Sequence, residues 1–140
     1  MKQLNDSLWG RGIILIFWTI FFCAIITGVS MGVSSVFASD VDAGKKVFRK
    51  CNVCHTLEEG GKKKIGPNLF GIMGRASGTA EGFKYSKAMK TAAVTWNVDT
   101  LTQYLSKPKD FIPGNKMAFP GLKKPEQIEN VIAYIIEKSK

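Results

Sequence analysis

Residues 51–61 read CNVCHTLEEGG, in which two cysteines stand two residues apart and His55, the single histidine of the chain, follows at once. This pattern fits a thiol redox pair, part of a metal site, or the attachment site of a c-type haem. A structural zinc ion needs four ligands, and residues 39–140 hold no Cys or His besides Cys51, Cys54 and His55. A redox pair would follow a strand in an α/β pattern, whereas this motif follows a helical segment. The haem interpretation is therefore favoured.

A haem explains each fixed residue of the motif. The two-residue gap lets the Cys51 and Cys54 sulfurs reach one porphyrin edge, and it makes His55 an axial iron ligand. No second histidine exists, and Met117 lies in IPGNKMAFPG, a loop stiffened by two Pro-Gly pairs. We therefore predict Met117 as the second axial ligand. The other methionines after residue 39, Met73 and Met89, are predicted to be packing residues.

The first 38 residues differ from the rest of the chain. An uncharged run of 27 residues reaches from Gly12 to Ala38, and Val36 and Ala38 fit the small-residue rule of a signal-peptidase site. A cleaved signal peptide over residues 1–38 is favoured, because only Ser39 would separate an anchor from the following domain and a tethered carrier needs a flexible spacer. An uncleaved membrane anchor is the alternative, since the run is long enough to span a bilayer.

The remaining residues, 39–140, are strongly basic. They hold 18 Lys+Arg and 10 Asp+Glu, a net charge of +8 with the histidine neutral. Such a surface suits nucleic acid, anionic membranes or acidic proteins, and export argues against nucleic acid. We expect a monomer in the periplasm of a Gram-negative bacterium. If the anchor is retained, the domain is expected on the inner membrane, facing the periplasm.

Helix signals predict an all-α domain with long loops. Asp40, Ser86 and Asn97 are predicted to cap helices, and Pro125 suits the first turn of a last helix that ends near Lys138. The predicted helices cover residues 41–51, 87–93, 98–107 and 125–138. The last of them has an apolar stripe of Ile128, Val131, Ile132 and Ile135.

Two segments, residues 56–85 and 108–124, are predicted as loop. The first contains seven glycines and almost no periodic pattern. A loop of this length counts against a self-sufficient protein core in a small domain. A large apolar cofactor would fill the centre and organise the loops.

Four longer segments carry a resemblance to a known family: GKKVFRKCNVCHT, GPNLFGIMGR, TWNVDTLTQYLSKPKDFIPGNKM and FPGLKK. In this order and spacing they resemble the class I cytochromes c, within the group of mitochondrial cytochrome c and bacterial cytochrome c2. The resemblance covers nearly all of residues 40–140. It implies an all-α fold of about three main helices and one or two short ones, wrapped with long loops around one covalently bound haem c in a domain over residues 39–140.

The resemblance also implies roles for single residues. Cys51 and Cys54 correspond to the thioether sites, and His55 and Met117 to the axial ligands. Pro67 corresponds to the residue whose carbonyl accepts the hydrogen bond of the ligand histidine. Arg75, Tyr85 and Trp96 match residues around the haem propionates, and Tyr104 and Phe119 match aromatics on the methionine side.

Other implied positions concern packing and departures from the family. Gly44 and Phe48 are expected to meet the last helix near Val131 and Tyr134. Two positions depart from the family pattern: Met89 stands where an asparagine is common, and Asn115 where a threonine is common. Both changes affect the hydrogen-bond network that is expected around Met117.

The resemblance implies a soluble one-electron carrier and not an enzyme. A quinol:cytochrome c oxidoreductase is the expected donor, and a terminal oxidase or photosynthetic reaction centre the expected acceptor. A membrane-anchored cytochrome with the same chemistry is the first alternative, and a peroxidase or gas-binding haem protein the second. The basic residues expected to dock acidic partners are Lys50, Lys62, Lys63, Lys64, Lys116, Lys123 and Lys124.

Overall fold

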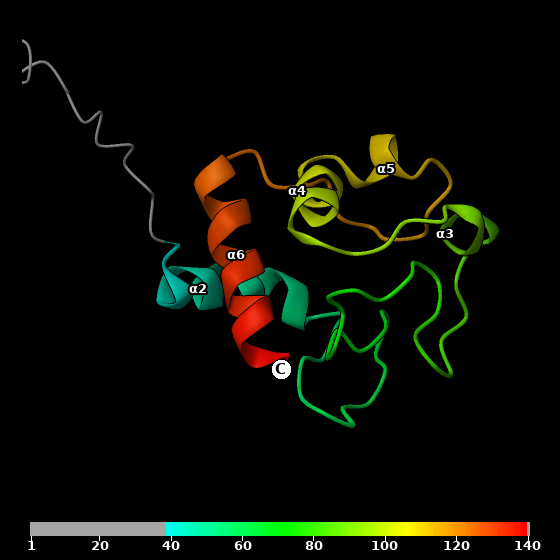
Figure 1. The fold of residues 1–140 in the computed structure, drawn as a ribbon, viewed down its shortest axis with the longest axis horizontal. Coiled ribbons are helices and arrows are strands. Elements are labelled where there is room, and N and C mark those ends of the chain that lie inside the picture. Colours follow the sequence, from blue (N-terminus) through cyan, green and yellow to red (C-terminus); the bar gives the residue numbers. More distant parts are fainter. Residues whose placement is uncertain (1–38, 140) are drawn as a thin grey trace, which may run out of the picture. The chain divides into compact units, whose positions relative to one another are not determined.

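Helices joined by long loops make up residues 39–139, which are the part of the chain that this computed structural model describes (Figure 1). The predicted leader, residues 1–38, lies outside the described residues. Within 39–139, pairing between extended segments is limited to one isolated antiparallel bridge, Ala76 to Thr95, and no helix is long and apolar enough to cross a membrane. The helices are α2 (Val41–Asn52), α3 (Lys87–Thr91), α4 (Val98–Ser106), α5 (Pro108–Phe111) and α6 (Pro125–Lys138).

Side-chain caps start three of these helices at the predicted places. The Asp40 carboxylate accepts the N–H of Ala43 at 3.0 Å, and the Ser86 hydroxyl accepts that of Met89 at 3.1 Å. Asn97 and Thr100 form a reciprocal capping box, in which each side chain accepts the other's backbone N–H at 2.8 and 2.9 Å. Such caps satisfy N–H groups that have no partner inside the helix.

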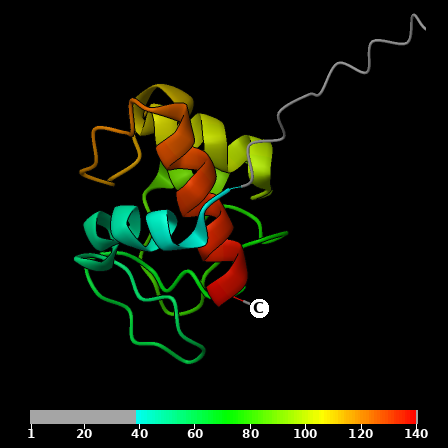
Figure 2. The same ribbon diagram turned by 90° about the vertical axis from the view of Figure 1, so that its left-hand side faces the viewer.

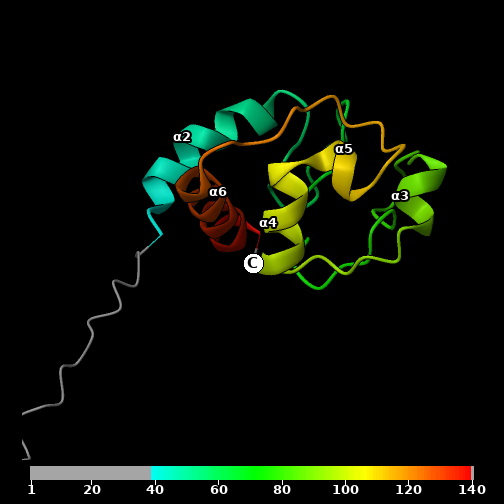
Figure 3. The same ribbon diagram turned by 90° about the horizontal axis from the view of Figure 1, so that it is seen from above.

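Helix α6 lies between α2 and α4, as the view from above shows (Figure 3). Figure 2 shows α2 running across α6. At this crossing Gly44 is buried against the backbone of Asn130, and the rings of Phe48 and Tyr134 lie 5.3 Å apart. The predicted meeting of the first and last helices is therefore confirmed. The predicted stripe is buried throughout, with exposures of 0–4% for Ile128, Val131, Ile132 and Ile135.

The second predicted loop, residues 108–124, contains helix α5, so the prediction of loop over its first four residues was wrong. Pro108 follows the predicted end of the preceding helix at residue 107, and it also starts the next helix. Proline suits a first helical position, because its fixed φ is already helical and its missing N–H would have no partner there. The N–H of Phe111 donates to Lys107 O at 3.0 Å and closes this short turn.

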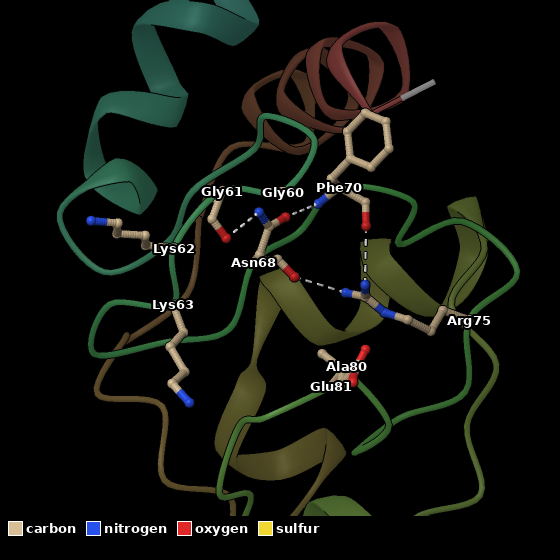
Figure 4. Close-up of a pocket in the computed structure, with 9 residues that line it drawn as sticks. All are labelled: Gly60, Gly61, Lys62, Lys63, Asn68, Phe70, Arg75, Ala80 and Glu81. Carbon is tan, nitrogen blue, oxygen red and sulfur yellow. Dashed lines mark hydrogen bonds between the residues drawn. The ribbon is translucent and has the colours of Figure 1, made fainter.

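The glycine-rich segment between α2 and α3 is held by hydrogen bonds from side chains to backbone. Arg75 donates to the carbonyls of Phe70 and Asn68, both at 3.0 Å, as Figure 4 shows. The Lys63 ammonium donates to Gly82 O at 2.6 Å, which joins two stretches that lie 19 residues apart. These bonds take the place of a regular ladder, so a segment without periodic pattern still adopts a defined path.

Candidate cofactor site

A cavity of about 450 Å³ opens among α2, α4 and the loops on either side of α3 and α5. Its volume lies within the range of roughly 300–1,000 Å³ that is usual for sites of organic ligands. Every residue predicted for the cofactor site lines this one cavity. These residues are Cys51, Cys54, His55, Pro67, Arg75, Tyr85, Trp96, Tyr104, Met117 and Phe119.

The cysteines enter the cavity from the end of α2. Cys51 lies in the last helical turn, and the N–H groups of Cys54 and His55 both donate to Cys51 O, at 3.0 and 2.9 Å. This turn presents both thiols and the imidazole to one space. The thiols are not joined in a disulfide, and burial raises the pKa of the Cys51 thiol to about 11. Both sulfurs are therefore available for bonds to a ligand in the cavity.

The His55 ring is held from outside the cavity by the next loop. Its Nδ1 lies 2.8 Å from Pro67 O, and because a carbonyl can only accept, Nδ1 carries the hydrogen and Nε2 is left with a free lone pair. Burial lowers the pKa of the ring, which favours this neutral form. Gly66 lies directly against the imidazole, where any β-carbon would overlap the ring. The hydrogen bond predicted between Pro67 and His55 is thus confirmed.

Met117 enters the same cavity from the loop that follows α5. The hydroxyl of Tyr104 lies 3.7 Å from its Sδ and donates to it. Tyr104 is only 7% exposed and packs against Trp96, with ring centroids 5.0 Å apart. Burial raises the pKa of Tyr104 to about 12, so its proton is retained at neutral pH. A thioether thus lines the cavity together with an imidazole that has one free nitrogen.

The chemistry of these donors fits a c-type haem. Two thiols two residues apart provide for covalent attachment, while an imidazole nitrogen and a thioether sulfur provide for axial ligation of iron. Most of the remaining lining is aliphatic and aromatic, as a porphyrin face requires. The close contact of Gly66 with the His55 ring further shows a backbone shaped around the imidazole.

Part of the lining was not predicted from the sequence as site. Leu101 and Leu105 form an i, i+4 pair on α4, and Ile135 belongs to the stripe of α6, so helical periodicity could have found them. Leu69 and Ile72 lie in the glycine-rich loop, where no periodicity marks them. Met89, predicted as a packing residue, is buried in the core and also lines the cavity. Met73, predicted likewise, packs against the same core.

The predicted docking lysines lie at different places around the site. Lys50 and Lys116 line the cavity itself. Lys64 donates to Asn52 O at 2.7 Å, beside the cysteine motif, whereas Lys123 and Lys124 precede α6. Two of the predicted docking lysines, one from α2 and one from the methionine loop, therefore belong to the cavity lining.

A second and more open depression, of about 680 Å³, is lined by residues within 60–81 of the glycine-rich segment, which Figure 4 shows. Lys62 and Lys63 line it together with Glu81 and Arg75, and Arg75 also lines the first cavity. None of the predicted attachment or axial residues borders it. The donor chemistry therefore belongs to the smaller and more enclosed cavity.

Comparison with known proteins assigns the family. The family model of cytochrome c matches residues 41–137. The chain belongs to the cytochrome c family. It is 58% identical to cytochrome c of Chlamydomonas reinhardtii over 99 residues, which cover 70% of this chain and 88% of the relative. It is 43% identical to cytochrome c2 of Blastochloris viridis over 107 residues, 76% of this chain and 84% of the relative.

A solved structure agrees with this assignment. Cytochrome cH from Methylobacterium extorquens superimposes with a TM-score of 0.67 at 40% identity, over 71% of this chain and 99% of that chain. The predicted all-α class I cytochrome c fold is thus confirmed. As a cytochrome c, the chain binds one covalently attached haem c and acts as an electron carrier and not as an enzyme.

Proposed function

We propose that this cytochrome c carries single electrons with His55 and Met117 as the axial ligands of its haem and with Cys51 and Cys54 as the thioether sites. The observation that supports this most strongly is the common cavity, which brings Met117 together with a motif more than 60 residues away. The bound haem supplies the Fe(II)/Fe(III) couple. The chain supplies the ligands, their orientation and a surrounding of low dielectric constant.

Orientation of the ligands comes from their hydrogen bonds. Pro67 O holds the Nδ1–H of His55, which keeps Nε2 directed at the metal position and raises the basicity of the ring. The Tyr104 hydroxyl donates to Met117 Sδ, which withdraws electron density from the sulfur. Since both ligands are held before any electron arrives, little rearrangement should accompany a change of oxidation state.

Replacement of Met117 by Ala tests the proposed ligation. The wild-type ferric protein is expected to show a Met-to-iron charge-transfer band and to bind cyanide slowly at neutral pH, because the thioether blocks the sixth position. Met117→Ala should lose the band and bind cyanide at least about 100-fold faster, since the loss of a few kcal/mol of ligand stabilisation corresponds to such a factor. Absorption spectra and stopped-flow mixing measure both properties.

The same experiment distinguishes the rival class, a peroxidase or gas-binding haem protein. Such a protein needs an open iron position, so wild type would bind cyanide or carbon monoxide as fast as Met117→Ala does. Equal rates, together with the absence of the charge-transfer band in wild type, would exclude the carrier with permanent methionine ligation.

The partners we propose are membrane redox complexes with acidic docking faces. A quinol:cytochrome c oxidoreductase would reduce the protein, and a terminal oxidase or a photosynthetic reaction centre would oxidise it. The support is electrostatic, because Lys50 and Lys116 line the cavity and residues 39–140 carry a net charge of +8. Charge complementarity of this kind gives fast and short-lived encounters. The remaining proposed docking residues are Lys62, Lys63, Lys64, Lys123 and Lys124.

We also propose that the mature protein is soluble and periplasmic and begins at Ser39. The support lies in the uncharged run that ends at Ala38 and in the absence of spacer sequence before Asp40, which caps α2. N-terminal sequencing of the protein purified from its native cells should read SDVDAGKK. A read that begins at Met1, on protein recovered from the membrane fraction, would instead establish the anchored form.

A further inference from the structure

Asn115 is a buried polar residue between α5 and Met117. It is only 3% exposed, although an amide side chain usually lies at the surface. It is not among the residues that line the cavity, so contact with the cofactor does not account for its burial. Its burial must therefore be accounted for by partners within the chain.

The side chain of Asn115 makes three hydrogen bonds to backbone atoms, two as donor and one as acceptor. Its Nδ2 donates to Pro108 O at 2.7 Å and to Ile112 O at 2.8 Å. Its Oδ1 accepts the backbone N–H of Met117 at 2.9 Å. One side chain thereby joins the end of α5 to the backbone of the residue proposed as the iron ligand.

The partners also determine which way the amide points. Pro108 O and Ile112 O can only accept, and the Met117 N–H can only donate, so nitrogen must face the helix and oxygen must face the methionine. Two donors and one acceptor in this arrangement require an amide. A hydroxyl offers only one hydrogen, and a carboxylate offers none at neutral pH.

The backbone of Asn115 is held as well. Its N–H donates to Ile112 O at 3.1 Å, and its carbonyl accepts the ammonium of Lys109 at 2.6 Å. Lys109 belongs to α5 and Ile112 is the residue that follows it, so the backbone of residue 115 is bonded to this helix and to its C-terminal cap. Five hydrogen bonds thus converge on a residue two positions before Met117.

We propose that Asn115 is a positioning residue that clamps the Met117 loop onto α5 and thereby keeps the thioether on the iron. The clamp rests on the proposed ligation by Met117. It acts at the backbone of Met117, whereas Tyr104 acts at its sulfur, and the two contacts come from different elements. Loosening the clamp allows the loop to leave the iron without unfolding the α2 and α6 crossing.

A graded set of variants tests the clamp on the holo protein. Asn115→Ala removes all three side-chain bonds, while Asn115→Thr keeps one donor and one acceptor. We expect Asn115→Ala to raise the rate of cyanide binding to the ferric protein by about 10-fold or more and to weaken the Met-to-iron charge-transfer band, as the loss of partners for buried polar groups implies. Asn115→Thr should fall between Ala and wild type.

Ile128→Val provides the matched control. Ile128 is 4% exposed on α6, and the loss of one buried methyl group should shift guanidinium unfolding to a slightly lower denaturant concentration. The control should bind cyanide within about twofold of wild type, because Ile128 neither lines the cavity nor bonds to the methionine loop. Guanidinium unfolding of each variant separates the global effect from the local one.

The outcomes separate the clamp from the ligation itself. If Met117→Ala binds cyanide no faster than wild type, the ligand assignment fails and the clamp fails with it. If Met117→Ala is fast but both Asn115 variants keep the wild-type rate and band, the clamp alone is overturned. If Asn115→Ala does not accumulate as holo protein, Asn115→Thr decides the question. Cyanide binding by Asn115→Thr at the wild-type rate would then overturn the clamp.

Discussion

Gly66 shows how a single residue shapes the cofactor site. Its α-hydrogen side faces the His55 imidazole so closely that a β-carbon would overlap the ring. The adjacent Pro67 holds the same ring through its carbonyl at 2.8 Å. The two residues together determine where the imidazole of the proposed ligand His55 lies, although neither of them has a functional side chain.

Gly66→Ala should therefore disturb the site from the backbone. The added methyl group must displace either the imidazole or the loop, and we expect the holo protein to lose about 1–3 kcal/mol of unfolding free energy, as overpacking usually costs. The reduction potential should shift as well, because the His55 hydrogen bond changes. Guanidinium titration and redox potentiometry measure the two effects.

Gly60→Ala serves as the matched control for this substitution. Gly60 has a φ of +65° and nothing within 4 Å of an added β-carbon, so only backbone strain of about 1 kcal/mol is expected and the potential should not move. Equal effects of the two substitutions on the potential would contradict the role given to Gly66.

At the residue scale, the sequence allowed predictions where chemistry restricts the choice. A CxxCH motif and a methionine between two Pro-Gly pairs are recognisable because few other residues could do the same work. Asn115 was noticed only as a departure from a family pattern, and nothing in the sequence indicated that its side chain bonds to Pro108, Ile112 and Met117. Its three partners lie two to seven residues away and are backbone atoms, which leave no sequence signal.

At the scale of elements, the helices pack mainly where α2 and α6 cross. Gly44 allows the two backbones to approach, and the pair of Phe48 and Tyr134 closes the contact beside it. Cys51 lies on α2 two turns beyond Gly44, so this crossing also anchors the helix that presents the cysteine motif. Stability of the fold and placement of the site are therefore linked through one helix pair.

Gly44→Ala should destabilise the protein even though alanine is the better helix former. Propensity alone predicts a gain of about 1 kcal/mol. The β-carbon, however, would overlap the Asn130 carbonyl and lie 2.9 Å from Tyr134 Cβ, so we expect a net loss of about 2 kcal/mol.

Chemical denaturation of the holo protein measures this change. Lys46→Ala, on the exposed side of the same helix, should stay within about 0.5 kcal/mol of wild type. A stabilised Gly44→Ala protein would show that the helices do not approach as closely as the structure indicates.

Helix boundaries were predictable where side chains cap them. Asp40, Ser86 and Asn97 all accept the N–H groups that their positions predicted. Helix α5 was missed because it is a single turn, for which periodicity gives no signal, and its start coincides with the proline that ends α4. A proline between two helices ends the first and begins the second. From the sequence, only the end of the first helix was predicted.

Electrostatics acts at the scale of the whole molecule. The formal net charge of the full chain is +9, and lysines from α2 and from the methionine loop line the cavity. Charge gathered near the proposed electron path should steer acidic partners and orient them on arrival.

Electron transfer with a purified quinol:cytochrome c oxidoreductase should consequently depend strongly on salt. The bimolecular rate is expected to fall about tenfold or more between roughly 0.01 M and 0.15 M salt, as the Debye length shrinks from about 30 to 8 Å. Stopped-flow kinetics across this range measures the slope.

Two charge-reversal variants test whether the electrostatic effect on the rate arises at the cavity. Lys50→Glu, at the cavity, should lower the rate at low salt more than Lys90→Glu, an exposed lysine of α3 that does not line the cavity. An electron-transfer rate that does not change with salt would contradict docking at the cavity. Equal effects of Lys50→Glu and Lys90→Glu on this rate would contradict it as well.

The sequence by itself determined the cofactor, the fold class and the four residues proposed to hold the haem, because a covalent attachment motif and a helical stripe are local patterns. Only the tertiary structure decided how the ligands are held. Pro67 meets His55, Asn115 holds the Met117 backbone and Gly44 meets Asn130 through single atoms on different segments. Such contacts depend on distances between atoms that the folded backbone alone sets, since hydrogen bonds and steric overlap change within a few tenths of an ångström.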